Sequence, residues 1–359
     1  PPAFAPYQAS FFVSGSGSVV SHDPHLNEDG EALYRFLLGH AATPPDFVLR
    51  CRGSHSETHT RLVTHRDNDG HTHHRSEHYT ERVPDFDFAI DVGQNIVGEP
   101  IHWTMQDSTP ASRGRMFLEV GIEDTKRRAK RSERKLAKAW QAERTGKGLP
   151  PWVAMDFTSD HANPSQPNTV FRSSWTLRQW ADDYCTSQKY LKEFDYEKLV
   201  YGWNFDALKA AVRSTIFSTH YRGDISVDFE TTAAHVSVRS DNPLSRALSK
   251  TWVKVILSLL LIYPFILLYR RYASHGGGRW AVCGGAYALK RMELIEPEPD
   301  TKAPLPAFQD DYMDEEPPAA SSSQPFGGSS EGASRIVGLR EGEWFRQWEG
   351  TIRRAVMNR

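Results

Sequence analysis

Hydrophobic and polar residues alternate most clearly in the first third of the chain. Residues 47–92 form two long extended runs around Asp67-Asn68-Asp69-Gly70, a strong turn signal between threonine- and valine-containing arms. At the end of the second run, residues 85–92, apolar side chains alternate with polar ones and share one face of a strand. The pattern predicts a long, polar β-hairpin over about 47–92, joined to the core at this end.

Other segments carry shorter periodic patterns. Helical spacing or a charged helical composition marks four segments: 32–38, 124–143, 175–192 and 205–219. Strands are predicted at 116–122, 225–229 and 235–238, the last two as a second hairpin. This mixture predicts an α+β fold for a soluble domain over residues 1–250.

One segment, residues 252–269, is apolar enough to enter a membrane. No charge occurs from residue 255 to 269, and aromatic and basic residues flank the run on both sides. As a helix it would extend about 27 Å, which matches a thin endoplasmic reticulum bilayer. We predict a transmembrane helix with these anchor residues: Trp252, Leu257, Leu260, Leu261, Pro264, Leu267, Tyr269, Arg270 and Arg271. The alternatives are a re-entrant or monotopic hairpin bent at Pro264, and a buried core helix.

The side of the membrane is harder to predict. Basic residues are nearly balanced before and after the apolar segment, so the positive-inside rule does not decide the orientation. Residues 1–7 lack the basic and apolar regions of a secretory signal. The three cysteines are widely spaced without a metal or redox motif, and the net charge is only −2. We therefore expect a cytosolic N-terminal domain on an endomembrane such as the endoplasmic reticulum.

The remaining quarter of the chain, residues 270–359, is predicted to change character twice. Residues 270–295 read as a juxtamembrane segment, and residues 296–334 as a disordered acidic linker rich in proline and serine. Residues 335–359 regain helical periodicity as an amphipathic C-terminal helix. Its apolar stripe, the predicted partner-binding surface, comprises Trp344, Phe345, Trp348, Ile352 and Val356. The stripe would cover a membrane surface, a partner or a groove of its own domain.

The hairpin carries many histidines, which raises the question of a metal site. His71 and His73 have the i, i+2 spacing of ligands on one strand face, and a cross-strand histidine could add a third ligand to zinc. The pairing register stays open between His65 opposite His74 and His59 opposite His78. The preferred interpretation is a solvated hairpin without cofactor, and no catalytic residue is predicted.

A basic run lies on the predicted helix over 124–143. It contains Lys126, Arg127, Arg128, Lys130, Arg131, Arg134, Lys135 and Lys138. Such a run binds lipid headgroups, RNA phosphates or an import receptor, or it is an exposed helix face. With a membrane anchor in the same chain, headgroups are the favoured ligand and nucleic acid is not expected.

Three stretches, residues 54–61, 83–91 and 337–353, resemble a group of uncharacterised fungal single-pass membrane proteins. The resemblance implies a single membrane segment and no particular activity. The leading hypothesis is a membrane-anchored adapter or tether that binds protein partners or lipid headgroups. The alternative is a metal-dependent enzyme that uses the histidine-rich hairpin.

Overall fold

The computed structural model describes residues 6–66, 72–122, 125–153, 173, 175–294 and 334–358. The chain forms two compact units. The main unit holds residues 1–290 and 338–359, and the second unit is Arg291–Val337. In the second unit, β13 (Arg291–Leu294) pairs antiparallel with β14 (Ser334–Val337). The fold class is α+β, as predicted.

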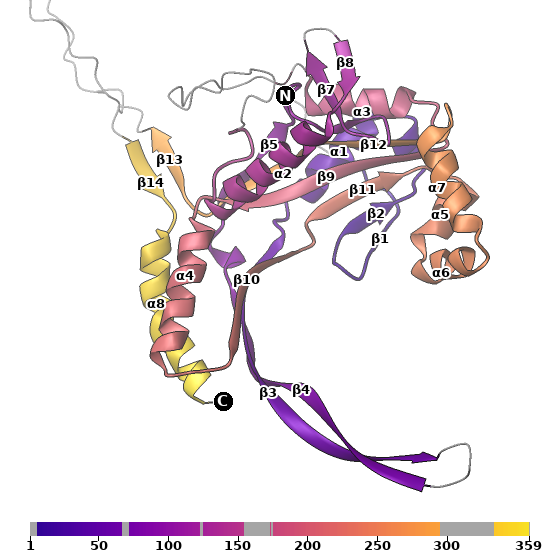
Figure 1. The fold of residues 1–359 in the computed structure, drawn as a ribbon. Helices are drawn as coiled ribbons and strands as arrows, with labels where there is room; N and C mark the ends of the chain where they lie inside the picture. The colour runs from indigo at the N-terminus through magenta and orange to yellow at the C-terminus, as the bar shows by residue number, and fades with distance from the viewer. Residues whose placement is uncertain are drawn as a thin grey trace, which may run out of the picture. The chain divides into compact units, whose positions relative to one another are not determined.

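The main unit is built on a mixed sheet whose strands follow the order β1-β2-β11-β9-β12-β5, with β6 also paired to β12 (Figure 1). These strands are β1 (Phe11–Val13), β2 (Val19–Ser21), β5 (Val97–Thr104), β6 (Ser112–Arg113), β9 (Leu191–Tyr201), β11 (His235–Arg239) and β12 (Gly277–Ala288). In the centre, β9 pairs antiparallel with β11 and parallel with β12. The sheet therefore uses strands from both sides of the apolar segment.

Two helices cover one face of this sheet, α1 (Gly30–Ala41) and α3 (Leu177–Thr186). Asp29 caps α1 by accepting a hydrogen bond from the Glu31 amide at 2.9 Å, which confirms the helix predicted after Asp29. Phe194 of β9 is fully buried beneath them and packs edge-on against Tyr184 of α3. The opposite face of β9 carries acidic side chains, so the two faces of the central strand differ in chemistry.

A second sheet has the order β10-β3-β4, from β10 (Asp224–Thr232), β3 (Asp46–Arg66) and β4 (Thr72–Asp91). The predicted hairpin is confirmed. Its distal half extends beyond β10, whose last partner on β3 is Ser54 (Figure 1). The register places His65 opposite His73, so both registers considered from the sequence are wrong, because Arg66 pairs with Thr72 around an odd-numbered loop.

Helices α4 (Phe205–Ser218) and α8 (Glu341–Met357) pack beside each other and share a core with the second sheet (Figure 1). The remaining elements are β7 (Glu119–Ile122), β8 (Thr125–Arg128), α2 (Arg131–Gly146), α5 (Pro243–Ser249), α6 (Thr251–Leu259), α7 (Ile262–Tyr272) and two short 3-10 turns, His25–Asn27 and Gly93–Asn95. The helix α4 agrees closely with its prediction over 205–219.

Several predicted elements differ from the structure. Strands β10 and β11 do not form a hairpin, because β10 pairs with β3 while β11 pairs with β2 and β9 in the other sheet. The helix predicted over 175–192 stops at Thr186, and Leu191 already begins β9. The predicted juxtamembrane segment 270–295 likewise contains β12, a strand of the main sheet. The predicted linker 296–334 lies outside the described residues apart from Ser334, which begins β14.

Candidate membrane-binding site

The apolar segment forms two helices rather than one. Helix α6 (Thr251–Leu259) and helix α7 (Ile262–Tyr272) meet at 107°. In the described part of the chain, no single helix has the length and hydropathy of a membrane span, whereas this bent pair meets both requirements when its helices are taken together. The single straight helix predicted over 252–269 is therefore corrected.

Local sequence explains the break. In a continuous helix the ring of Pro264 would clash with the carbonyl of Leu260, four residues earlier. The break places Pro264 in the first turn of α7, where its missing N–H leaves no hydrogen bond unmade. Leu261 joins the helices in the left-handed region, with φ of 59°. The bend is thus favoured by the proline and opposed by the strained leucine.

Both ends of the bent pair return to the same row of the main sheet (Figure 1). Before it, Arg239 at the end of β11 is the partner of Glu193 on β9. After it, Arg279 near the start of β12 is the partner of the same Glu193. Strands on either side of β9 are about 10 Å apart, whereas a bilayer core is about 30 Å thick. The chain therefore leaves the sheet before the bent pair and returns to it afterwards at the same end of β9.

The outward side of the bent pair is an exposed apolar surface, which we call the apolar ridge. Neither helix contains a fully buried residue. Leu259 is 78% exposed and Phe265 is 69% exposed. The complete ridge comprises Trp252, Val255, Ile256, Leu259, Leu260, Leu261, Ile262, Phe265, Leu267, Leu268, Tyr269 and Tyr272. Large contiguous apolar patches on a protein surface mark sites that bind proteins or membranes.

Basic residues frame the apolar ridge. No aspartate or glutamate occurs from residue 242 to 292, while Lys250, Lys254 and Arg271 lie beside or within the two helices. Trp252 and Tyr272 stand near the two outer ends, with exposed fractions of 62% and 74%. Aromatic and basic residues around an apolar surface are typical of the bilayer interface.

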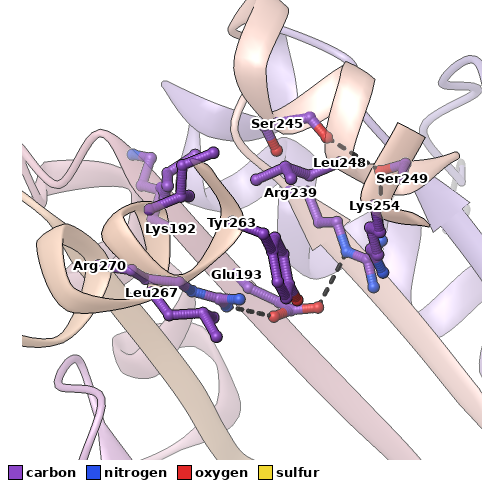
Figure 2. A pocket seen from close by; sticks show the side chains of 12 residues that line it. Lys192, Glu193, Arg239, Ser245, Leu248, Ser249, Lys254, Tyr263, Leu267 and Arg270 are labelled. Carbon is purple, nitrogen blue, oxygen red and sulfur yellow. Dashed lines mark hydrogen bonds and ion pairs between the residues drawn. The ribbon is translucent and has the colours of Figure 1, made fainter. Parts of the chain in front are cut away.

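The inward side of α7 is tied to the sheet by an ion-pair cluster (Figure 2). Glu193 accepts hydrogen bonds from Arg270 Nη2 at 2.8 Å and from Arg239 Nε at 2.9 Å. Burial raises the pKa of Glu193, but the guanidinium groups of Arg239 and Arg270 outweigh this and hold the pKa below its ordinary value. The cluster fixes the base of the bent pair and leaves its apolar side free.

Strand β1 adds apolar residues that the sequence analysis did not single out. Phe11, Phe12 and Val13 are each 44% to 60% exposed. A cavity of about 500 Å³ joins Phe11 and Phe12 to Lys250 at the start of α6. The signal in the sequence is a three-residue apolar run between small polar residues, which is too short to distinguish from an ordinary strand.

The second apolar surface predicted from the sequence, on the C-terminal helix, has a different environment. Trp344 is 1% exposed and packs against Trp203, with ring centroids 5.6 Å apart. Ile352 and Val356 are fully buried, and Phe345 and Trp348 are partly buried against the same core. The stripe therefore occupies a groove of its own domain. Its side chains are buried there and do not form the partner-binding surface predicted from the sequence.

The basic run is divided between two elements instead of one helix. Lys126, Arg127 and Arg128 lie on β8, and α2 begins at Arg131 after the Lys130 amide has donated to Glu133 at 2.7 Å. The β8 residues already have partners. Lys126 lies 4.8 Å from the Trp175 ring, Arg127 pairs with Glu133, and Arg128 lies 5.3 Å from the Phe117 ring. Headgroup binding through the rest, Lys130, Arg131, Arg134, Lys135 and Lys138, stays a prediction.

The structure does not describe the side chains of the two histidines considered as zinc ligands. His71 lies outside the described residues, and the side chain of His73 is not described. Among the described residues, no group of three or more histidine, cysteine, aspartate or glutamate side chains could hold a metal ion. Closer to the hairpin base, His55 is bound to Asp85 at 2.8 Å and to Glu57 at 3.0 Å. In that part of the hairpin a histidine pairs with carboxylates, and the absence of a cofactor stays a prediction.

In comparisons with known proteins, no family model, no curated protein and no solved structure matches this chain.

Proposed function

We propose that this chain is a monotopic membrane protein, an adapter held on one leaflet by α6 and α7. The carrying observation is that an apolar ridge is exposed on a bent helix pair whose two ends return to neighbouring positions of one sheet. Burial in lipid removes the apolar side chains from water, which favours binding by about 25 cal/mol per Å² of buried apolar surface. The sheet remains on the side of the membrane from which the helices enter.

A bilayer fits the ridge better than a protein groove would. The bend divides the apolar residues between two helices that meet at 107°. The charged residues beside the two helices are all basic, and no acidic residue occurs from residue 242 to 292. Amphipathic helices in this setting lie about 5–10 Å deep at the boundary of headgroups and acyl chains. Anionic headgroups complement Lys250, Lys254 and Arg271.

The endoplasmic reticulum was predicted by matching the length of residues 252–269 to a bilayer thickness. That comparison applies only to a helix that crosses the membrane. For a monotopic anchor, the organelle and the cytosolic side stay predictions without this support. The adapter role rests on the anchor, which would hold the α+β unit at the membrane surface.

Vesicle flotation of the full chain tests the anchor. The variant Leu259→Glu/Phe265→Glu places two charges in the apolar ridge, and we expect binding to drop by at least about 100-fold, because each Leu or Phe side chain contributes about 1.5–3 kcal/mol on burial. The matched control is Leu62→Glu/Phe217→Glu, which changes the same residue types at positions 68% and 56% exposed elsewhere in the main unit. Equal loss in both variants, or no loss in the first, contradicts the proposal.

A further inference from the structure

A small cavity lies between the bent helix pair and the start of β9 (Figure 2). Its volume is about 90 Å³, several times the roughly 10–15 Å³ that one water molecule requires. Its polar lining comes from five elements: Lys192 and Glu193 from β9, Arg239 from β11, Ser245 and Ser249 from α5, Lys254 from α6, and Tyr263 and Arg270 from α7. The cavity thus sits directly beneath the apolar ridge.

The charges around this cavity do not balance. Glu193 is the one acidic residue in its lining, and it is shared by Arg239 and Arg270. Lys254, half-exposed at the rim, forms no ion pair with another described residue. Lys192 also lines the cavity, but its Nζ donates to the carbonyls of Asn27 and Tyr184 instead. The two guanidinium groups, the Lys254 ammonium group and one carboxylate leave an excess of two positive charges.

Hydrogen-bond donors also remain. Arg239 Nη1 donates to Ser249 Oγ at 3.2 Å, which places this hydroxyl beside the guanidinium. The buried Nε of Arg270 has no hydrogen-bond partner in the described part of the chain. The Ser249 hydroxyl already donates to the Ser245 carbonyl at 3.1 Å. Guanidinium and ammonium groups that converge on one small space are the donors that phosphate oxygens accept from.

We infer that this cavity binds the phosphate of an anionic phospholipid, of the phosphomonoester class that phosphatidate represents. The inference rests on the proposed function, since α6 and α7 must lie in a leaflet for a headgroup to reach the rim at Lys254. The cavity volume of about 90 Å³ is enough for one phosphate group. A phosphomonoester carries about −1.5 to −2 charges near neutral pH, which matches the excess of two positive charges.

Vesicle flotation separates a site from general surface attraction. Wild type is compared on phosphatidylcholine vesicles, on vesicles containing a minor fraction of phosphatidate, and on vesicles with phosphatidylserine at equal surface charge. High salt shortens the screening length and suppresses attraction between exposed charges more than contacts within a cavity. At high salt we expect wild type to bind phosphatidate vesicles at least about tenfold more tightly than either other vesicle.

Two variants remove one positive charge each. Lys254→Ala acts at the cavity rim and should abolish the phosphatidate preference. Arg271→Ala acts on the exposed side of α7, outside the cavity lining, and should weaken binding to both anionic vesicles by about fivefold at low salt while keeping the preference. Millimolar inorganic phosphate should reduce the preference of wild type, because it competes for the same donors.

The outcomes distinguish the two proposals. If wild type binds all three vesicles equally at high salt, or if both variants lose the preference equally, the headgroup site is refuted while the anchor stands. If wild type binds none of the vesicles, the anchor itself is refuted, and the headgroup site with it.

Discussion

The bent pair α6–α7 and the C-terminal helix α8 both carry an apolar surface with a tryptophan, but the two surfaces have opposite environments. Both combine tryptophan, other apolar residues and basic residues in one short stretch. On α8 the apolar stripe is buried, with Trp344 at 1% exposure, whereas on α6 Trp252 is 62% exposed. An amphipathic pattern therefore identifies a surface that needs a cover, and the cover is supplied by residues distant in sequence.

The largest predicted effect is the difference between these two tryptophans. Trp344→Ala should lower the free energy of unfolding by about 3–5 kcal/mol, because it leaves a cavity against Trp203 in the core. Trp252→Ala should change it by less than about 0.5 kcal/mol, because the side chain has little protein around it. Urea unfolding in mild detergent, followed by circular dichroism, measures both. Equal losses would show that the two helices are packed alike.

A smaller effect is expected at the ion-pair cluster that fixes α7. Glu193→Gln leaves Arg239 and Arg270 without their carboxylate and should cost about 2 kcal/mol of unfolding free energy. Glu349→Gln is the matched control on α8, where the pair with Arg353 is exposed, and should cost less than about 0.5 kcal/mol.

The Glu193 effect also has a predicted pH dependence. The folded-state pKa lies below the ordinary value of 4.5, so the carboxylate stabilises the fold fully above that pH. As pH falls through the lower folded-state pKa, the contribution is lost. The stability difference between wild type and Glu193→Gln should therefore be constant at neutral pH and shrink in acid. A difference that grows in acid would contradict the assigned shift.

The smallest effect concerns the bend itself. Leu261→Gly should stabilise the main unit by about 1 kcal/mol, because glycine adopts a φ of 59° without steric cost. Leu260→Gly, at the neighbouring position with φ of −78°, should instead destabilise by about 0.5–1 kcal/mol. Both changes remove one exposed leucine, so they weaken vesicle binding equally. Opposite signs in urea unfolding support the bend, and a loss of stability for both contradicts it.

The two regions also show which parts of the fold can be predicted from patterns in the sequence. Two extended runs around a turn signal revealed the hairpin over 47–92, and helical spacing revealed α4 and the existence of α8. The central strand β9 was missed because its charged residues suggest an exposed segment. Lys192 is only 8% exposed, and it can be buried because its Nζ donates to the carbonyls of Asn27 and Tyr184. Partners so distant in sequence cannot be inferred from local periodicity.

The candidate site was located by composition but not by shape. Residues 252–269 were identified from hydropathy, and Pro264 was recognised as a possible bend. Whether the segment crosses a bilayer depends on where the strands before and after it pair, which is a long-range property of β9, β11 and β12. The cavity beneath α7 depends on the same pairing, since Arg239 and Arg270 meet only through Glu193.

The most direct test of the anchor is the sidedness of its two flanks. Cysteines introduced at the exposed Arg222, before the bent pair, and at the exposed Ser274, after it, are treated with a membrane-impermeant maleimide in sealed vesicles. The unsubstituted protein supplies the background from its own three cysteines. A monotopic anchor predicts that both positions react to the same extent before detergent is added. If one position reacts only after the vesicles are permeabilised, the segment crosses the membrane and the account is wrong.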